Sequence, residues 1–149
     1  MATDSGATPG TGIGVDHWGD RLGLEFTEMG PSRVVARMIA GPQHQQPYGI
    51  LHGGAWCTIV EMVASYGAAR VAETRGHVGV VGVANQTDFL RSHSTGELQI
   101  VGEPLHVGRR QQLWEVLIRR ASDGVLVARG QVRFQTLDVL PANREREAT

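Results

Sequence analysis

The chain has 149 residues, of which 41% are hydrophobic and 19% are charged, and its formal net charge is -1. This length favours one domain, and the composition is typical of a globular protein with its own core. The near-neutral charge excludes a general electrostatic attraction to nucleic acid. All fourteen basic residues are arginine, whose planar guanidinium group suits phosphates and carboxylates. The single cysteine, Cys57, excludes an intrachain disulfide, and we expect a cytoplasmic location.

Three regions follow one another along the chain. Residues 1–15 are rich in Gly, Thr and Ser and lack the basic and apolar segments of a secretory signal, so we expect a disordered lead-in. Residues 16–140 carry the patterns of one folded domain, and residues 141–149 form a charged tail. The apolar stretch 53–69 contains a glutamate at its middle, so we do not expect it to span a membrane.

The hydrophobic pattern predicts two strands, one helix and four further strands. The helix begins at Gly53, ends between Glu73 and Gly76, and has almost no polar side, so other parts of the protein should surround most of it. Turn residues separate the later strands, with Asp123-Gly124 as the strongest hairpin signal. Short turns favour an antiparallel sheet, and we expect an α+β fold in which this sheet wraps the helix. The predicted strands are 21–29, 33–40, 78–90, 97–106, 110–120 and 125–137.

One carboxylate lies in the middle of the apolar helix. Glu61 is the single charged residue of the segment GGAWCTIVEMVASYGAA, and Ser65 follows it one turn later on the same face. Free N–H groups at Gly53 and Gly54 would stabilise an oxygen that gains negative charge. A carbonyl polarised there and a carboxylate two turns along are suited to attack on an acyl group. A buried ion pair of Glu61 with Arg91 or Arg133 remains open as the alternative.

Other motifs narrow the chemistry. The six histidines lack the HExxH spacing of zinc hydrolases, and nothing matches the GxSxG of serine hydrolases. The glycines at 10–14 do not complete a nucleotide-binding GxGxxG motif. We therefore expect neither a metal nor a cofactor. His52, immediately before the glycine pair, fits a helix-capping or packing role as well as a catalytic one.

Two segments are similar to a known family. Residues 46–55 (QPYGILHGGA) with Glu61-Met62, and residues 103–109 (EPLHVGR) with 114–116 (WEV), resemble the hotdog-fold acyl-CoA thioesterases. The nearest branch contains the phenylacetic-acid-pathway, glutamate-type 4-hydroxybenzoyl-CoA and 1,4-dihydroxy-2-naphthoyl-CoA thioesterases. The resemblance covers roughly residues 20–138 and implies a hotdog fold, an antiparallel sheet of about six strands around one long central helix.

The resemblance also implies roles for individual residues. Glu61 falls on the catalytic carboxylate, which acts as nucleophile or as general base. Gly53 falls on the glycine whose N–H polarises the thioester carbonyl. Gln46 and His52 fall on residues that orient the thioester or water, and Ser65 falls on a hydroxyl position that holds water.

Substrate-binding residues are implied in the same way. The family shares each active site between two subunits, and the partner contributes from the strand after the helix, here residues 83–91. That strand holds Asn85 and Gln86, and Arg91 falls where relatives keep an arginine near the coenzyme phosphates. Arg109 and Arg110 occupy a turn that grips the nucleotide end in relatives, although a solvated turn is an equal alternative.

Two positions depart from the family pattern; the first, Gln86, leaves the acyl group open, and the second, Ser92, changes only a turn. Gln86 stands where relatives often have histidine, and Ser92 stands where they often have proline. The resulting hypothesis is a homodimeric or homotetrameric acyl-CoA thioesterase that prefers an aromatic acyl group, with coenzyme A present only as part of the substrate. A non-catalytic acyl-CoA-binding module on the same fold is the alternative. A hydratase is disfavoured because its Asp/His pair is absent, and the sequence does not reveal the pathway.

Overall fold

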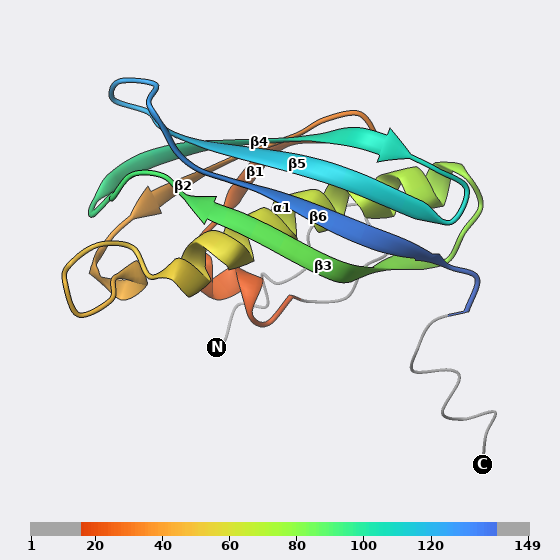
Figure 1. The fold of residues 1–149 in the computed structure, drawn as a ribbon, viewed down its shortest axis with the longest axis horizontal. Coiled ribbons are helices and arrows are strands. Elements are labelled where there is room, and N and C mark those ends of the chain that lie inside the picture. Colours follow the sequence, from red (N-terminus) through yellow and green to blue (C-terminus); the bar gives the residue numbers. More distant parts are fainter. Residues whose placement is uncertain (1–15, 140–149) are drawn as a thin grey trace, which may run out of the picture.

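A computed structural model describes residues 16–139, so the predicted lead-in 1–15 and tail 141–149 lie outside the described residues. The elements follow the predicted order of two strands, one helix and four strands (Figure 1). Two short 3-10 helices, Gly19–Leu22 and Pro42–His44, flank the first two strands. The main elements are β1 (Glu25–Met29), β2 (Val34–Ala40), α1 (Gly53–Thr74), β3 (Gly79–Phe89), β4 (Gly96–Val107), β5 (Gln111–Arg120) and β6 (Leu126–Leu137).

The six strands form one antiparallel sheet in the order β1-β2-β4-β5-β6-β3. The Asp123-Gly124 hairpin is confirmed, and Gly124 supplies the positive φ of 71° that the turn between β5 and β6 requires. The segment 90–95 joins β3 to β4, but these two strands are not neighbours in the sheet. Strand β4 pairs with β2, whereas β3 pairs with β6 and forms the opposite edge of the sheet.

The first strand begins later than its alternating pattern predicts. The expected start was residue 21, but residues Gly19–Leu22 form a 3-10 turn and β1 starts at Glu25. Gly23 ends the turn in the left-handed region with φ of 72°, a backbone angle incompatible with an extended strand. Leu22 and Leu24 still pack against the core. The alternation of Leu22 and Leu24 therefore predicts correctly that both side chains pack on the core, but the backbone at Leu22 forms a 3-10 turn and not a strand.

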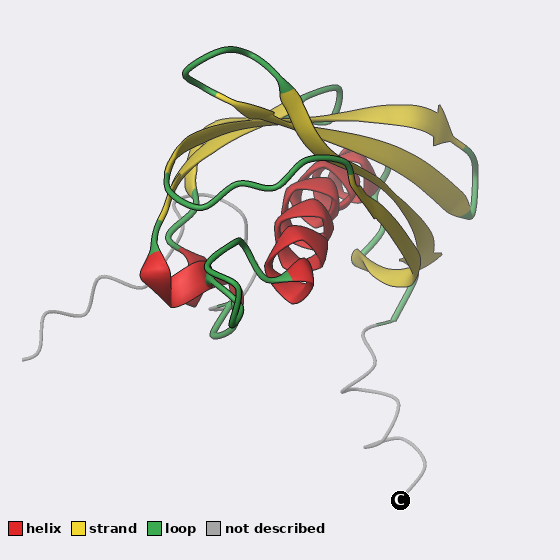
Figure 2. Ribbon diagram, turned by 60° about the vertical axis from the view of Figure 1, so that its left-hand side comes forward, coloured by secondary structure: helices red, strands yellow, loops and turns green. Residues whose placement is uncertain are grey.

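Helix α1 fills the concave side of the curved sheet (Figure 2). Its small residues allow close contact, and at Gly67 an added methyl carbon would come within 2.3 Å of the Trp114 ring. Twelve of its 22 residues are buried, which confirms that most of the helix surface is covered. Large core side chains contributed by the helix and sheet include Ile59, Val60, Val63, Trp114, Ile118 and Phe134.

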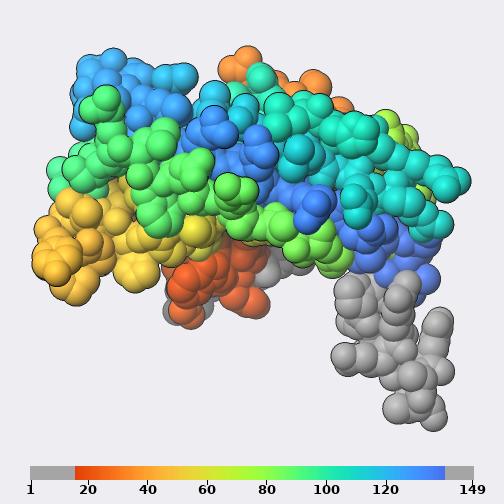
Figure 3. Space-filling model, in the orientation of Figure 1, coloured from red at the N-terminus to blue at the C-terminus, as the bar shows by residue number. Residues whose placement is uncertain are grey.

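One face of the helix and one edge of the sheet remain open in the single chain. Cys57, Glu61 and Ser65 share the open helix face and are half-buried. The adjacent edge strand β3, green in Figure 3, runs along the visible surface and carries the exposed apolar residues Val83 and Phe89. No helix within residues 16–139 is long and apolar enough to cross a membrane.

Candidate active site

The start of α1 leaves free one of the two backbone donors that the sequence predicts to be free: the Gly53 N–H remains, whereas the Gly54 N–H is bound by His52. His52 is the N-cap residue, and its Nδ1 accepts a hydrogen bond of 2.8 Å from the Gly54 N–H. The capping interpretation of His52 is therefore confirmed in the geometry. The Gly53 N–H lies in the first turn, where no partner within the helix exists, and the positive end of the helix dipole acts at the same point. Such a group can stabilise a carbonyl oxygen as it gains negative charge.

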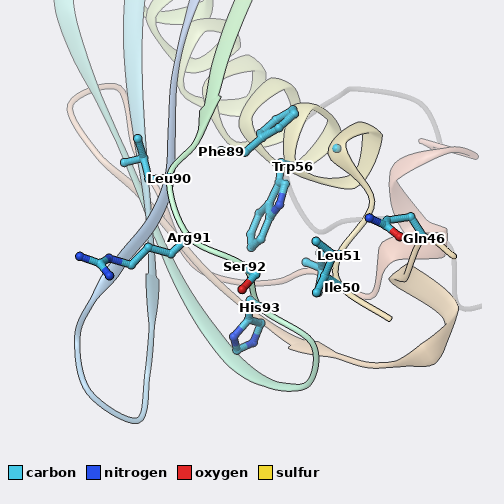
Figure 4. A pocket seen from close by; sticks show the side chains of 10 residues that line it. Gln46, Ile50, Leu51, Trp56, Phe89, Leu90, Arg91, Ser92 and His93 are labelled. Carbon is cyan, nitrogen blue, oxygen red and sulfur yellow. The ribbon is translucent and has the colours of Figure 1, made fainter. Parts of the chain in front are cut away.

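A cavity of about 280 Å³ lies at this end of the helix (Figure 4). Gln46, Gly53 and Arg91, all expected in a site, are among the residues that line it. Phe89 covers the helix start, because an added methyl carbon at Gly53 would come within 2.8 Å of its Cε2. The guanidinium of Arg91 points away from the apolar side chains in Figure 4. The remaining lining residues are Ile50, Leu51, Trp56, Leu90, Ser92 and His93.

The Glu61 carboxylate is held by strand β3. Its Oε2 accepts a hydrogen bond of 2.9 Å from Asn85 Nδ2, and the same amide donates to the Cys57 carbonyl oxygen at 3.2 Å. In the described part of the chain Glu61 forms no ion pair with Arg91 or Arg133. The alternative of a purely structural arginine pair is therefore not observed. The carboxylate is bound by a neutral donor on an open face.

The helix start and the carboxylate lie apart within one chain. Gly53 and Glu61 are separated by eight residues, which corresponds to about 12 Å along the helix axis. Strand β3 gives a similar spacing, since Asn85 at the carboxylate and Phe89 at Gly53 are about 13 Å apart along the strand. Attack requires a nucleophile about 3 to 3.5 Å from the reacting carbon. A carbonyl polarised by Gly53 is therefore out of reach of Glu61 of the same chain, contrary to the single-helix arrangement that the sequence suggests.

The remaining expected residues occupy other parts of the surface. Arg109 and Arg110 follow β4 in a turn at the far end of α1, where Arg75 at the helix C-cap donates to the Gly108 carbonyl oxygen at 2.9 Å. The 22 residues of α1 place this turn about 33 Å from Gly53. Gln86 lines a shallow hollow of about 40 Å³ with Arg129, on the sheet face opposite to Asn85.

Sequence reasoning did not identify the apolar wall of the cavity. Trp56 and Phe89 form its aromatic part, and neither is among the predicted site residues. A usable signal existed for Phe89, because residues 85, 87 and 89 alternate along one strand and therefore share a face. Trp56 lies one turn from Gly53 on α1, but a helical tryptophan is more often a core residue than part of a site.

A six-stranded antiparallel sheet wrapped around one long helix defines the hotdog class of proteins. The family model named Thioesterase superfamily matches residues 48–127. The chain belongs to this superfamily, and the class of activity that follows is thioester hydrolysis. The matched segment begins two residues after Gln46 and includes the helix and strands β3 to β5.

Sequence and structure comparisons agree with this assignment. The Mycobacterium tuberculosis protein Rv1847 is 49% identical over 121 residues, which cover 80% of this chain and 86% of the relative. The 1,4-dihydroxy-2-naphthoyl-CoA hydrolase of Escherichia coli is 34% identical over 97 residues, covering 65% of this chain and 70% of the relative. The crystal structure of AziG from S. sahachiroi has a TM-score of 0.76 and 43% identity, covering 80% of this chain and 95% of that one.

Proposed function

We propose that the protein is an acyl-CoA thioesterase that hydrolyses an aromatic acyl-CoA to the free acid and coenzyme A. The observation that carries the proposal is the Glu61 carboxylate, which stands on an open helix face and is held by Asn85 rather than neutralised by an arginine. Membership of the Thioesterase superfamily supports the reaction class. The relative from Escherichia coli named as a CoA thioester hydrolase supports coenzyme A as the thiol.

The proposed reaction needs two groups at the thioester. The Gly53 N–H donates to the carbonyl oxygen and stabilises the negative charge that develops on it. Glu61 attacks the carbonyl carbon, or removes a proton from the water that attacks it. When Glu61 attacks, the thiolate of coenzyme A leaves, and water then hydrolyses the anhydride formed between Glu61 and the acyl group. When Glu61 acts as a base, the water oxygen bonds to the acyl carbon, and the thiolate leaves and takes up the proton that Glu61 removed. Gln46 and Ser65 orient the thioester and the water, and no metal ion takes part.

The separation of Gly53 from Glu61 supports a site built by two copies of the chain. Strand β3 is a long edge strand with unpaired backbone groups and exposed apolar side chains, Val83 and Phe89 among them. Such an edge is a template for pairing with another strand. Antiparallel pairing of two β3 strands would set the two helices side by side in opposite directions. The carboxylate of one chain would then approach the helix start of the other.

Substrate recognition follows from the same assembly. Trp56 and Phe89 provide flat apolar surfaces in the cavity, which favour an aromatic acyl group. Arg109 and Arg110 lie too far from Gly53 to serve the site of their own chain, so they would bind the coenzyme phosphates at a site shared with a second copy. A cytoplasmic location and a dimer or tetramer complete the proposal.

The experiment replaces the carboxylate with an amide. Glu61→Gln should lower kcat for benzoyl-CoA by about 100-fold or more, because neither nucleophilic attack nor proton removal is available to an amide. The assay follows release of free thiol from the acyl-CoA. Glu73→Gln is the matched control, since Glu73 lies on the same helix, is exposed and contacts Arg70 at 2.8 Å. Its kcat should stay within about twofold of the wild-type value, because such exposed ion pairs contribute little.

Two outcomes would contradict the proposal. Near-normal hydrolysis by Glu61→Gln would remove Glu61 from the reaction. Binding of acyl-CoA by the wild-type protein, without thiol release from short, long or aromatic acyl-CoAs, would show that the fold serves as a binding module.

A further inference from the structure

Strand β3 contains an irregularity beside the Glu61 carboxylate. Gly82 pairs with Phe134 and Ala84 pairs with Arg133, so Val83 is an extra residue without a partner on β6. In a regular strand, residues 82 and 85 would point to opposite faces because their separation is odd. The bulge restores them to one face. Both Gly82 and Asn85 therefore face α1 at the level of Glu61.

The two residues contact different oxygens of the carboxylate. Asn85 Nδ2 donates to Oε2 at 2.9 Å. On the other side, a methyl carbon added at Gly82 would lie 2.4 Å from Oε1, so the carboxylate occupies the space that a side chain at 82 would fill. One oxygen is bound by an amide, and the other lies against bare backbone.

A third residue fixes the direction of the amide. The Thr87 hydroxyl donates to Asn85 Oδ1 at 2.7 Å, so the oxygen end of the amide faces Thr87 and the nitrogen end faces the helix. The second Nδ2 hydrogen is used by the Cys57 carbonyl oxygen at 3.2 Å. Every polar atom of the Asn85 side chain thus has a partner, and a reversed amide would place its oxygen against two acceptors.

We propose that Asn85 is a positioning residue for the thioesterase reaction, which holds Glu61 in its reactive orientation through the bulge at Val83 and the hydroxyl of Thr87. This inference rests on the proposed function of Glu61. It differs from the role in substrate binding that the family resemblance implies for Asn85. The bound Oε2 anchors the carboxylate, and Oε1 remains for the acyl carbon or for water.

The packing of two copies would strengthen this contact. Asn85 is exposed in the single chain, so water competes for the carboxylate. A second copy covering β3 would exclude that water, and a hydrogen bond to a charged group is stronger where water is absent. The hydrogen bonds from Thr87 to Asn85 and from Asn85 to Glu61 would then lie within the proposed contact between the two chains.

The test separates positioning from binding by steady-state kinetics with benzoyl-CoA. Asn85→Ala should lower kcat by about 10- to 100-fold, the range expected for loss of a hydrogen bond to a charged group, and should leave KM within about twofold. Asn85→Asp should lower kcat at least as much as Asn85→Ala does, because two carboxylates would then face each other.

The Thr87 variants test the hydroxyl that orients the Asn85 amide. Thr87→Val should lower kcat, whereas Thr87→Ser keeps the hydroxyl and should keep kcat close to the wild-type value. Gln131→Ala, on the opposite sheet face, is the control.

Several results would overturn the inference. A raised KM with unchanged kcat in Asn85→Ala would mean that Asn85 contacts the substrate. Equal kcat values for Thr87→Val and Thr87→Ser would show that the Thr87 hydroxyl does not orient the Asn85 amide. A wild-type enzyme that releases thiol, with Glu61→Gln inactive and Asn85→Ala fully active, would reject this inference while the proposed function stands.

Crystal structures give a readout that does not depend on activity. In Asn85→Ala the Glu61 side chain should leave the position beside Gly82, and in Thr87→Ser it should keep that position. An unmoved carboxylate in Asn85→Ala would overturn the positioning role even if the wild-type protein released no thiol.

Discussion

At the start of α1, His52 has a clear structural function in addition to the chemical one that the family resemblance implies. Its Nδ1 accepts the Gly54 N–H at 2.8 Å, and its own backbone N–H donates to the His44 carbonyl oxygen at 2.9 Å. The side chain therefore satisfies one of the donors left free at the helix start. Because His52 is exposed, this cap contributes without burial of the ring.

Replacement of the cap gives a prediction for stability. His52→Ala should lower the free energy of unfolding by about 1 kcal/mol, because the Gly54 N–H loses its acceptor. His52→Asn should stay close to the wild-type value, since asparagine is a preferred N-cap residue. Urea denaturation measures both variants. Equal losses in the two variants would show that the imidazole stabilises the protein by some contact other than the cap.

Two histidines are buried, although residue type alone does not predict their burial. His44 and His93 are each 5% exposed, yet neither carries a motif in the sequence. His44 accepts from the Gly41 N–H at 3.1 Å, and its Nε2 faces the Leu22 carbonyl oxygen at 2.9 Å. Both ring nitrogens of His44 are thus used to join loops. His44 therefore joins two loops by hydrogen bonds, and these partners could not be inferred without the fold.

Among the elements, the helix and the order of strands were predictable because each follows from a local period. The switch from a helical pattern to alternation after Gly76, and the Asp123-Gly124 turn, mark their boundaries without knowledge of the sheet. The place of β3 beside β6 is a long-range choice. It depends on how the strands close around α1, which no local pattern encodes. The bulge at Val83 belongs to the same category, and so does the contact of Asn85 with Glu61.

The far end of the helix is joined to the sheet by a small group of charges. Asp138, just after β6, contacts His77 Nδ1 at 3.1 Å and Arg110 at 3.0 Å. The hydrogen bond with His77, followed by the charge of Arg110, lowers the pKa of the Asp138 carboxyl below its usual value of 3.8. One carboxylate thereby links the start of β3, the turn between β4 and β5, and the end of β6.

This link predicts a dependence of stability on pH. A carboxyl whose pKa is lower in the folded state stabilises the fold fully above its unfolded pKa, and the contribution is lost as pH falls through the folded pKa. Asp138→Asn should therefore be less stable than wild type at pH 7, and the difference should close as pH falls below 3.8. Guanidinium denaturation across this range measures the gap. A gap that persists in acid would assign the effect to something other than the charge.

At the scale of the whole molecule, a single chain separates the two parts of the proposed site. The helix start lies at the cavity, Glu61 lies two turns further along α1, and Arg109 and Arg110 lie at the opposite end. The sequence could name these residues, because Gly53 and Glu61 belong to the first segment that resembles the family, and Arg109 ends the second and is followed by Arg110. It could not show that they belong to separate regions of one chain, since that depends on the length and direction of α1. The proposed assembly of two chains would bring the helix start of one chain to the Glu61 carboxylate of the other.

The assembly gives the last prediction. Val83 is 53% exposed at the bulge of the edge strand, so a lysine there would place a charge in the proposed contact between two β3 strands, where an unpaired charge is costly. Val83→Lys should shift the protein to a monomer of the 16.1 kDa chain in light scattering, and thiol release should fall with it. Ile39→Lys is the matched control, since Ile39 is 59% exposed on β2, and it should leave the protein at least dimeric and active. A monomeric Val83→Lys variant with full activity would show that one chain completes the site alone. A wild-type protein that is monomeric and releases thiol would show the same.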